Sequence, residues 1–194
     1  TPHRSTRCGV RLGIADHLGW AVAVTVDEDH EVVDRRRIDL VEPDVPNMPI
    51  HHDSKRLDEA QTAALVAQVR ASVRRAAGAA LDELAAALPA PVRSMSLRTW
   101  PADFPVDLAV LRRSPWEARA DAVMYRQELA ELAGARGWAV HRYEAKTVLD
   151  EAAAVLGART EAVLDGPRAR LGPPWTRDHR IAVAAAALAG RGER

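Results

Sequence analysis

The sequence predicts an α/β fold, a mixed five-stranded sheet with helices on both faces. Three segments with the apolar or alternating character of strands, Val10–Asp16, Trp20–Val26 and Glu31–Leu40, follow one another with only short turns between them, which is typical of a β-meander. Two later strand-like segments each follow a long helical pattern, as parallel strands joined by crossover helices do. The first segment has no clean polar face, so we expect it to be the central strand.

Length and composition limit the possible classes. The 194 residues predict a single domain over 1–194. With 27 basic and 27 acidic residues, the formal charge is zero, and no overall field draws the chain to nucleic acid or to a membrane. A single cysteine excludes an intramolecular disulfide. No run approaches the roughly 20 apolar residues of a membrane span, and no secretory signal pattern opens the chain. We therefore expect a cytoplasmic protein without membrane contact.

The first half continues from the meander into a long helix. Val10–Asp16 is a buried strand that ends in a carboxylate, and a proline-rich connector over 41–54 follows the meander. From Lys55 to Leu88 apolar residues recur at helical spacing without a proline, after a cap at Asp53 or Ser54. A helix of that length would extend about 50 Å, so we expect a bend or break near Gly78.

The second half alternates strands with helices. After a fourth strand, a second proline-rich connector over 100–115 ends in Ser114-Pro115-Trp116-Glu117, where Ser114 can cap a helix that Glu117 supports. The expected elements are a strand over 92–99, a helix to about 135, a strand over 138–143, a helix over 144–156, a weaker helix over 159–171 and a last helix over 177–189 capped by Thr176.

This order is that of the ribonuclease H-like three-layer fold, and within it the chain resembles the RuvC-type Holliday junction resolvases. Four segments carry the resemblance: 12–16 (Leu-Gly-Ile-Ala-Asp), 134–140 (Gly-Ala-Arg-Gly-Trp-Ala-Val), 143–148 (Tyr-Glu-Ala-Lys-Thr-Val) and 178–184 (Asp-His-Arg-Ile-Ala-Val-Ala). The chain also resembles a set of uncharacterised actinobacterial proteins that share the Gly-Pro-Pro-Trp…Asp-His pattern of residues 172–179.

The resemblance implies phosphodiester hydrolysis with Mg²⁺ or Mn²⁺, in which two ions clamp the attacking and leaving oxygens. Asp16 and Asp178 match two of the resolvases' metal ligands, and His179 is the expected further catalytic group. His17 and Glu117 are weaker candidates. We expect the carboxyl groups of Asp16 and Asp178 on one face and one end of the sheet, roughly 4–8 Å apart, within reach of a shared cation.

Two positions depart from the resolvase pattern. The glutamate that ends the resolvases' fourth strand is replaced here by Ser96, Leu97 or Arg98. One turn before Asp178, where another ligand is expected, stands Pro174 or Trp175. Structural interpretations also exist for the candidates themselves, because Asp16 can close a turn through its backbone, and Asp178 and Glu117 occupy first helical turns, where carboxylates are favoured.

Three functions therefore stay open. The first is a divalent-metal nuclease for branched or structured nucleic acid. The second is a catalytically inactive binding or scaffolding module, which the missing glutamate and the zero net charge favour. The third is a small-molecule phosphotransferase or phosphohydrolase. Contacts with nucleic acid would come from the arginine clusters Arg35–Arg37 and Arg112-Arg113, and the resemblance implies a homodimer.

Overall fold

The computed structural model describes residues 9–190, and Cys8 lies outside them. Five strands form one sheet in the order β3-β2-β1-β4-β5. The strands are β1 (Val10–Asp16), β2 (Trp20–Val26), β3 (Val32–Asp39), β4 (Val92–Arg98) and β5 (Ala139–Tyr143). Strands β1 to β3 pair antiparallel, and β4 pairs parallel with both β1 and β5. The predicted mixed sheet with a central first strand is confirmed.

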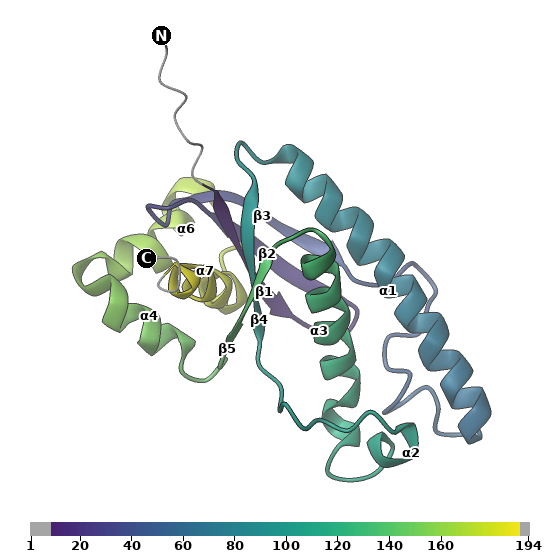
Figure 1. Cartoon of the computed structure of the whole chain (residues 1–194). Coiled ribbons are helices and arrows are strands. Elements are labelled where there is room, and N and C mark those ends of the chain that lie inside the picture. Colours follow the sequence, from purple (N-terminus) through teal and green to yellow (C-terminus); the bar gives the residue numbers. More distant parts are fainter. Residues whose placement is uncertain (1–8, 191–194) are drawn as a thin grey trace.

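Helices cover both faces of this sheet (Figure 1). The long helices α1 (Glu59–Ala87) and α3 (Glu117–Ala135) cover one face, and α7 (Arg177–Ala189) and α4 (Val148–Leu156) cover the other. Shorter elements complete the chain: α2 (Leu108–Leu111), a 3-10 turn over Gly157–Arg159, α5 (Thr160–Leu164) and α6 (Gly166–Leu171). The architecture has the three layers that the element order predicts.

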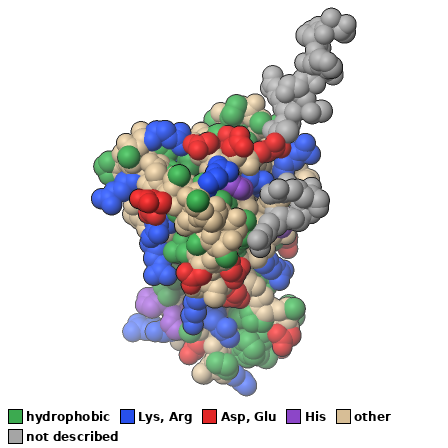
Figure 2. Space-filling view, turned by 90° about the vertical axis from the view of Figure 1, so that its left-hand side faces the viewer, with side chains coloured by type: hydrophobic (Ala, Val, Ile, Leu, Met, Phe, Trp, Pro, Cys, Tyr) green, Lys and Arg blue, Asp and Glu red, His purple; other side chains and the backbone are tan. Residues whose placement is uncertain are grey.

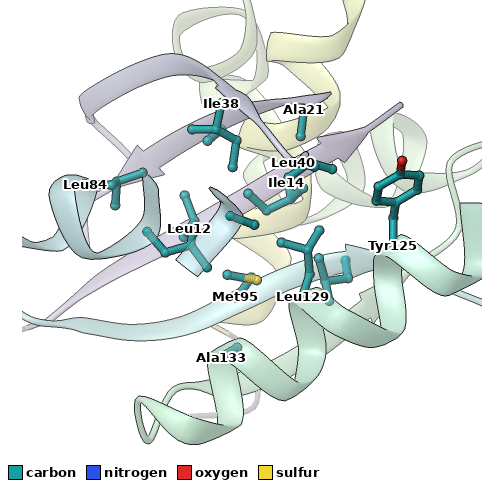
Figure 3. Close-up of a cluster of buried hydrophobic side chains, with 14 of the residues drawn as sticks. Leu12, Ile14, Ala21, Ile38, Leu40, Leu84, Met95, Tyr125, Leu129 and Ala133 are labelled. Atoms are coloured by element: carbon teal, nitrogen blue, oxygen red, sulfur yellow. The ribbon is translucent and has the colours of Figure 1, made fainter. Parts of the chain in front are cut away.

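The two faces of β1 contribute to different cores because successive side chains of a strand point to opposite sides. Leu12 and Ile14 pack with Met95, Tyr125 and Leu129 on the α1/α3 side (Figure 3). On the other side, Ala15 packs with valines of β2 and the alanine-rich inner face of α7. The parity of a residue in β1 therefore decides which helical layer its side chain meets.

Helix α7 lies unusually close to the central strand. A Cβ atom on Gly13 of β1 would be 1.8 Å from the backbone oxygen of Ala182 in α7. Real Cβ atoms do not approach a carbonyl oxygen so closely, so any larger residue at position 13 would force the helix away from the sheet. The small side chains of α7 and this glycine together permit the contact.

A buried carboxylate joins the two helices of the other face. Glu128 of α3 is fully buried, and its oxygens accept hydrogen bonds from Arg70 at 2.6 Å and Arg74 at 2.7 Å, both in α1. Because a buried charge is tolerated only when it is paired, these contacts fix α1 against α3.

The predicted bend or break of the long helix is wrong. Helix α1 is 29 residues long, continues through Gly78 without a break and extends past the edge of the sheet (Figure 1). Gly78 is buried beside α3, and its carbonyl accepts a hydrogen bond from Arg136 at 3.0 Å. A Cβ atom at this position would meet only ordinary contacts, 3.7 Å from the side chains of Leu132 and Arg136, so the close packing of α3 does not require this glycine.

Several predicted boundaries also change. Asp58 caps α1 through a capping box with Gln61, in place of Asp53 or Ser54, because residues 51–56 form turns. Ser114 does not cap α3, which begins at Glu117 without a side-chain cap. The connector over 100–115 contains the single turn α2, the helix expected over 144–156 begins at Val148, and the one expected over 159–171 is divided into α5 and α6.

The surface carries both signs of charge. On the face formed by α4, α6 and α7, positive and negative side chains are interspersed (Figure 2). Within residues 9–190, no helix has the length and apolar character needed to cross a bilayer.

Candidate functional site

The candidate residues gather at one end of the sheet, which we call the β1 rim. Here β1 ends at Asp16, β4 ends at Arg98 and β5 ends at Tyr143, while β2 begins at Trp20 after a tight turn. In open sheets of this kind, ligands bind beyond the carboxyl ends of the parallel strands. The rim is therefore the place at which to test the predicted chemistry.

Asp16 is buried, and its side chain points to the face that α3 covers. It has the same parity in β1 as Leu12 and Ile14, which belong to the α1/α3 core. Its Oδ2 accepts a hydrogen bond from Arg126 Nε of α3 at 2.8 Å, and its Oδ1 is 4.0 Å from Arg98 Nε. Arg126 also donates to the backbone oxygen of Thr99 at 3.2 Å. One guanidinium group thus hydrogen-bonds the carboxylate and a second lies 4.0 Å away, while Oδ1 itself has no hydrogen-bond partner among the described residues.

Tyr143 closes the same corner from β5. Its hydroxyl donates to the backbone oxygen of Ile14 at 2.7 Å in the buried interior. Burial raises the pKa of Tyr143, and the nearby charge of Asp16 raises it further. The phenol is therefore a fixed donor that stabilises the end of β1.

Asp178 lies in the first turn of α7, on the opposite face of the sheet from the Asp16 side chain. Its Oδ2 is 2.9 Å from Nε2 of His17, the residue that follows Asp16. The His17 ring stacks on the Trp20 indole with centroids 4.1 Å apart and planes 9° apart. The two carboxylates thus reach the same end of the sheet, but the predicted common face is wrong.

His179 completes the start of α7. Its Nδ1 accepts the backbone N–H of Thr176 at 3.1 Å, so the two residues form a capping box. Burial lowers the pKa of His179, and the charge of Arg35 lowers it further. The imidazole is therefore a neutral capping group in the folded protein.

The remaining candidates do not join these residues. Glu117 begins α3, and within residues 9–190 it has no hydrogen bond or ion pair to the other candidates. Two adjacent histidines of the 41–54 connector, which are not among the predicted site residues, also have other partners: the backbone N–H of His51 donates to Asp121 at 2.9 Å, and the His52 ring pairs with Asp53 at 3.1 Å. Neither histidine approaches the β1 rim through these contacts.

The described residues do not fit a two-metal centre. Mg²⁺ and Mn²⁺ require several hard oxygen ligands, and no three His, Cys, Asp or Glu side chains in the described part of the chain are grouped so that they could hold a metal ion. The end of β4, where the resolvases have a glutamate, holds Ser96, Leu97 and Arg98, so no carboxylate stands there and the last residue carries a positive charge. The catalytic and metal-binding roles of Asp16, Asp178 and His179 stay predictions that this arrangement does not favour.

The arginine clusters are partly occupied by internal contacts. Arg35 donates to backbone oxygens of Leu171 and Gly172 at 2.8 and 2.9 Å, and Arg36 pairs with Asp34 at 2.6 Å. Arg112 donates to two backbone oxygens of the 54–57 turn. These arginines are less available for nucleic acid than the clusters predict.

Two arginines outside the interior each cover an indole; Arg37 belongs to the predicted cluster Arg35–Arg37, whereas Arg142 was not predicted. The Arg37 guanidinium lies 4.1 Å from the centroid of the Trp20 ring, and that of Arg142 lies 3.9 Å from the centroid of Trp100. The sequence gives only a weak signal for the ion pair at Asp16, since Arg98 is one of three residues at the expected glutamate position and Arg126 is 110 residues from Asp16 in the sequence. The rim thus carries an arginine-capped indole at the start of β2 and another just after β4.

Comparison with solved structures identifies a related fold. A Thermus thermophilus RuvC in complex with a Holliday junction substrate matches with a TM-score of 0.50 and 15% sequence identity, over 95% of each chain. Another Thermus thermophilus RuvC structure matches with a TM-score of 0.49 and 15% identity, also over 95% of each chain. No protein-family model matches the chain, and no curated protein matches it by sequence. The fold is RuvC-like and ribonuclease H-like, and the expected likeness to actinobacterial proteins stays a prediction.

Proposed function

We propose that this chain is a nucleic-acid-binding module of the ribonuclease H-like fold, in which arginines take the place of a catalytic metal cluster. The observation that carries the proposal is the Asp16 carboxylate, 2.8 Å from the Arg126 guanidinium and 4.0 Å from that of Arg98. In a metal-dependent nuclease, carboxylates hold cations that contact the substrate phosphate. Here one carboxylate and two guanidinium groups leave a net positive charge at the end of β1, which suits a phosphate directly.

The aromatic groups of the rim support a strand with accessible bases as the partner. Trp20 and Trp100 are each covered by a guanidinium group, at 4.1 and 3.9 Å respectively. Aromatic side chains beside arginines provide stacking surfaces and phosphate contacts for unpaired nucleotides. A branched or partly single-stranded nucleic acid offers both unpaired bases for stacking and phosphates for the arginines.

The related structure supports the choice of partner. The RuvC with a TM-score of 0.50 was determined with a Holliday junction substrate. Dependence on Mg²⁺ or Mn²⁺ and a homodimeric state are expectations from the same resemblance, and the ion pair at Asp16 argues against the metal. The alternative functions, a nuclease and a phosphotransferase or phosphohydrolase, both need the carboxylates free.

A binding assay tests the proposal. Fluorescence anisotropy with four-way-junction, duplex and single-stranded DNA at about 50 mM salt should give binding that weakens linearly in log–log form with salt. Arg142→Gln should weaken binding several-fold and lower the salt slope by about one phosphate contact. Arg93→Gln is the matched control, because Arg93 is exposed at the other end of the sheet, near the start of β4. No binding to any probe would refute the proposal.

A cleavage assay separates the binding module from the nuclease. The labelled junction is incubated with the protein and with Mg²⁺ or Mn²⁺, and we expect it to stay intact. Metal-dependent cleavage by the natural protein that disappears in Asp16→Asn would show that Asp16 serves catalysis, and the proposal would then be wrong.

A further inference from the structure

A groove follows the outer edge of the sheet, between β3 and α1, and we call it the β3 groove. Its volume is about 1000 Å³. Residues 34–39 of β3 line one side, and Ala76, Ala79, Ala80 and Glu83 of α1 line the other. This volume is at the upper end of those of small-molecule sites, so the groove offers room for a larger ligand.

The groove runs along the backbone of β3. Six consecutive residues, 34–39, line it, although successive side chains of a strand point to opposite faces. Among residues 9–190, β3 is the outermost strand and pairs only with β2. Its other edge therefore presents unpaired backbone N–H and C=O groups to the groove. An extended peptide can add to a sheet at such an edge.

The wall formed by α1 leaves space for an added strand. Ala76, Ala79 and Ala80 lie on one flank of the helix, because residues three or four apart are neighbours on a helix surface. Their side chains are single methyl groups, so no long side chain from these positions fills the space beside β3. Ile38 belongs to the α1/α3 core and also lines the groove. A side chain that points from an added strand toward α1 thus meets an apolar surface.

One charged group on the α1 side of the groove has no partner. Asp34 pairs with Arg36 at 2.6 Å, and Glu42 pairs with Arg75 at 2.7 Å. Glu83 is exposed and makes no hydrogen bond or ion pair within residues 9–190. The hydrogen bond with Asp34 raises the pKa of Arg36, and the charge of Glu83 contributes to the same shift, so Glu83 lies near the Asp34–Arg36 pair. The opposite end of the groove is at Glu42.

We infer that the β3 groove binds an extended peptide segment of a partner protein, which adds to the sheet as a strand antiparallel to β3. The segment then runs from the Glu42 end to the Glu83 end, and every second side chain points toward α1. Residues 34–39 extend about 17 Å at about 3.4 Å per residue, enough for a segment of about five residues. The segment that fits has the pattern apolar-x-apolar-x-Lys/Arg, with its cation beside Glu83.

A second copy of this chain fits the groove less well. In an antiparallel pair of two β3 strands centred on the groove, Arg35–Arg37 of one copy would lie opposite the same three arginines of the other. Like charges directly opposite one another destabilise a sheet, and charged residues on an edge strand oppose self-pairing. A segment with one cation near Glu83 and Asp34 avoids this repulsion.

Selection from a phage-displayed library of random seven-residue peptides on the full chain tests the groove. We expect the enriched peptides to share the pattern apolar-x-apolar-x-Lys/Arg. The most enriched peptide is then synthesised with a fluorescent label, and its affinity is measured by fluorescence anisotropy. In NMR spectra of the labelled chain, this peptide should shift the backbone amide signals of residues 34–39 and 76–83.

Two variants and two controls locate the bound peptide. Ala79→Tyr should weaken its binding roughly tenfold or more, because the ring takes the space of the peptide. Ala67→Tyr is the matched control, since Ala67 is an exposed alanine of α1 outside the groove. Glu83→Gln should weaken binding roughly two- to fivefold, as the loss of one exposed ion pair does. Glu59→Gln, at the exposed start of α1, should leave it unchanged.

Three outcomes would overturn the inference. The first is that no peptide is enriched. The second is that the enriched peptides bind Ala79→Tyr as well as the natural chain, or lack a cation that depends on Glu83. The third is a dimer in sedimentation that Ala79→Tyr dissociates, because the occupant is then a second copy.

The inference goes beyond the proposed function and does not rest on it. Ala79 is not among the residues of the β1 rim, so Ala79→Tyr should bind the four-way junction as the natural chain does. Peptide binding without nucleic-acid binding would refute the module and support the groove. Nucleic-acid binding without any enriched peptide would do the reverse.

Discussion

The ion pair at Asp16 offers the most direct test of the structural interpretation. Arg126 contributes an Nε–H at 2.8 Å from a carboxylate whose side chain is 1% exposed, and its own side chain is 11% exposed. Replacing Arg126 with methionine leaves the carboxylate buried, with Arg98 at 4.0 Å as the remaining cation and with the hydrogen bond to Thr99 lost. Removing one partner of a buried pair costs about 3–5 kcal/mol, and the remaining arginine places this case at about 3 kcal/mol.

The second variant and the double variant isolate the pair. In Asp16→Asn, the amide oxygen can still accept from Arg126, so we expect a loss of about 2 kcal/mol. The double variant should lose no more than Arg126→Met alone, because neither group is then left without its partner. The resulting coupling energy is at least about 2 kcal/mol.

Urea unfolding followed by circular dichroism measures these free energies. For a chain of this length, about 3 kcal/mol corresponds to a Tm lower by roughly 6–12 °C. Asp82→Asn is the matched control, since Asp82 pairs with Arg136 at 2.7 Å but is 70% exposed, and its loss should cost less than about 1 kcal/mol. Additivity of the two single changes within about 0.5 kcal/mol would refute the structural role of the pair.

Two further predictions concern buried titratable groups. Glu128→Gln should lower the free energy of unfolding by about 2–4 kcal/mol, since two arginines lose a fully buried charged partner. The control Glu131→Gln, at a 69% exposed position, should lower it by less than about 1 kcal/mol. Equal losses for the two variants in urea unfolding would contradict this prediction. Burial lowers the pKa of His179, so below pH about 6.5 the unfolded chain takes up a proton that the folded protein does not. The free energy of unfolding therefore decreases as the pH is lowered. His179→Gln, which keeps an acceptor for the Thr176 N–H, should make that decline shallower between roughly pH 6.5 and 5, and an unchanged decline would contradict the assignment.

The sheet could be predicted from the sequence because its signals are local. Strand bounds follow from apolar runs and turns, so β1 and β2 match the predicted residues, and the central place of β1 follows from its lack of a polar face. The course of α1 could not be predicted in the same way. Whether Gly78 breaks a helix depends on what packs beside it, and Arg136 lies in a different segment of the sequence.

The candidate site was predictable in its position and not in its chemistry. Asp16 and Asp178 do reach the same end of the sheet, as the order of elements requires. Both sides of β1 are apolar, however, so nothing in the sequence tells which helical layer covers the side of Asp16. The partners of the two carboxylates, Arg126 and His17, depend on that choice.

The contact between Gly13 and Ala182 has a consequence beyond the packing of α7. The backbone of α7 contacts the backbone of β1 there without an intervening side chain, so the helix cannot move closer to the sheet. This contact sets the distance between α7 and the sheet. Asp178 is one helical turn from Ala182, so the same contact fixes the distance of Asp178 from the sheet. The depth of the cavity between β2, β3 and the first turn of α7 therefore depends on Gly13, because any side chain there would push the helix outward. Gly13 itself does not line that cavity.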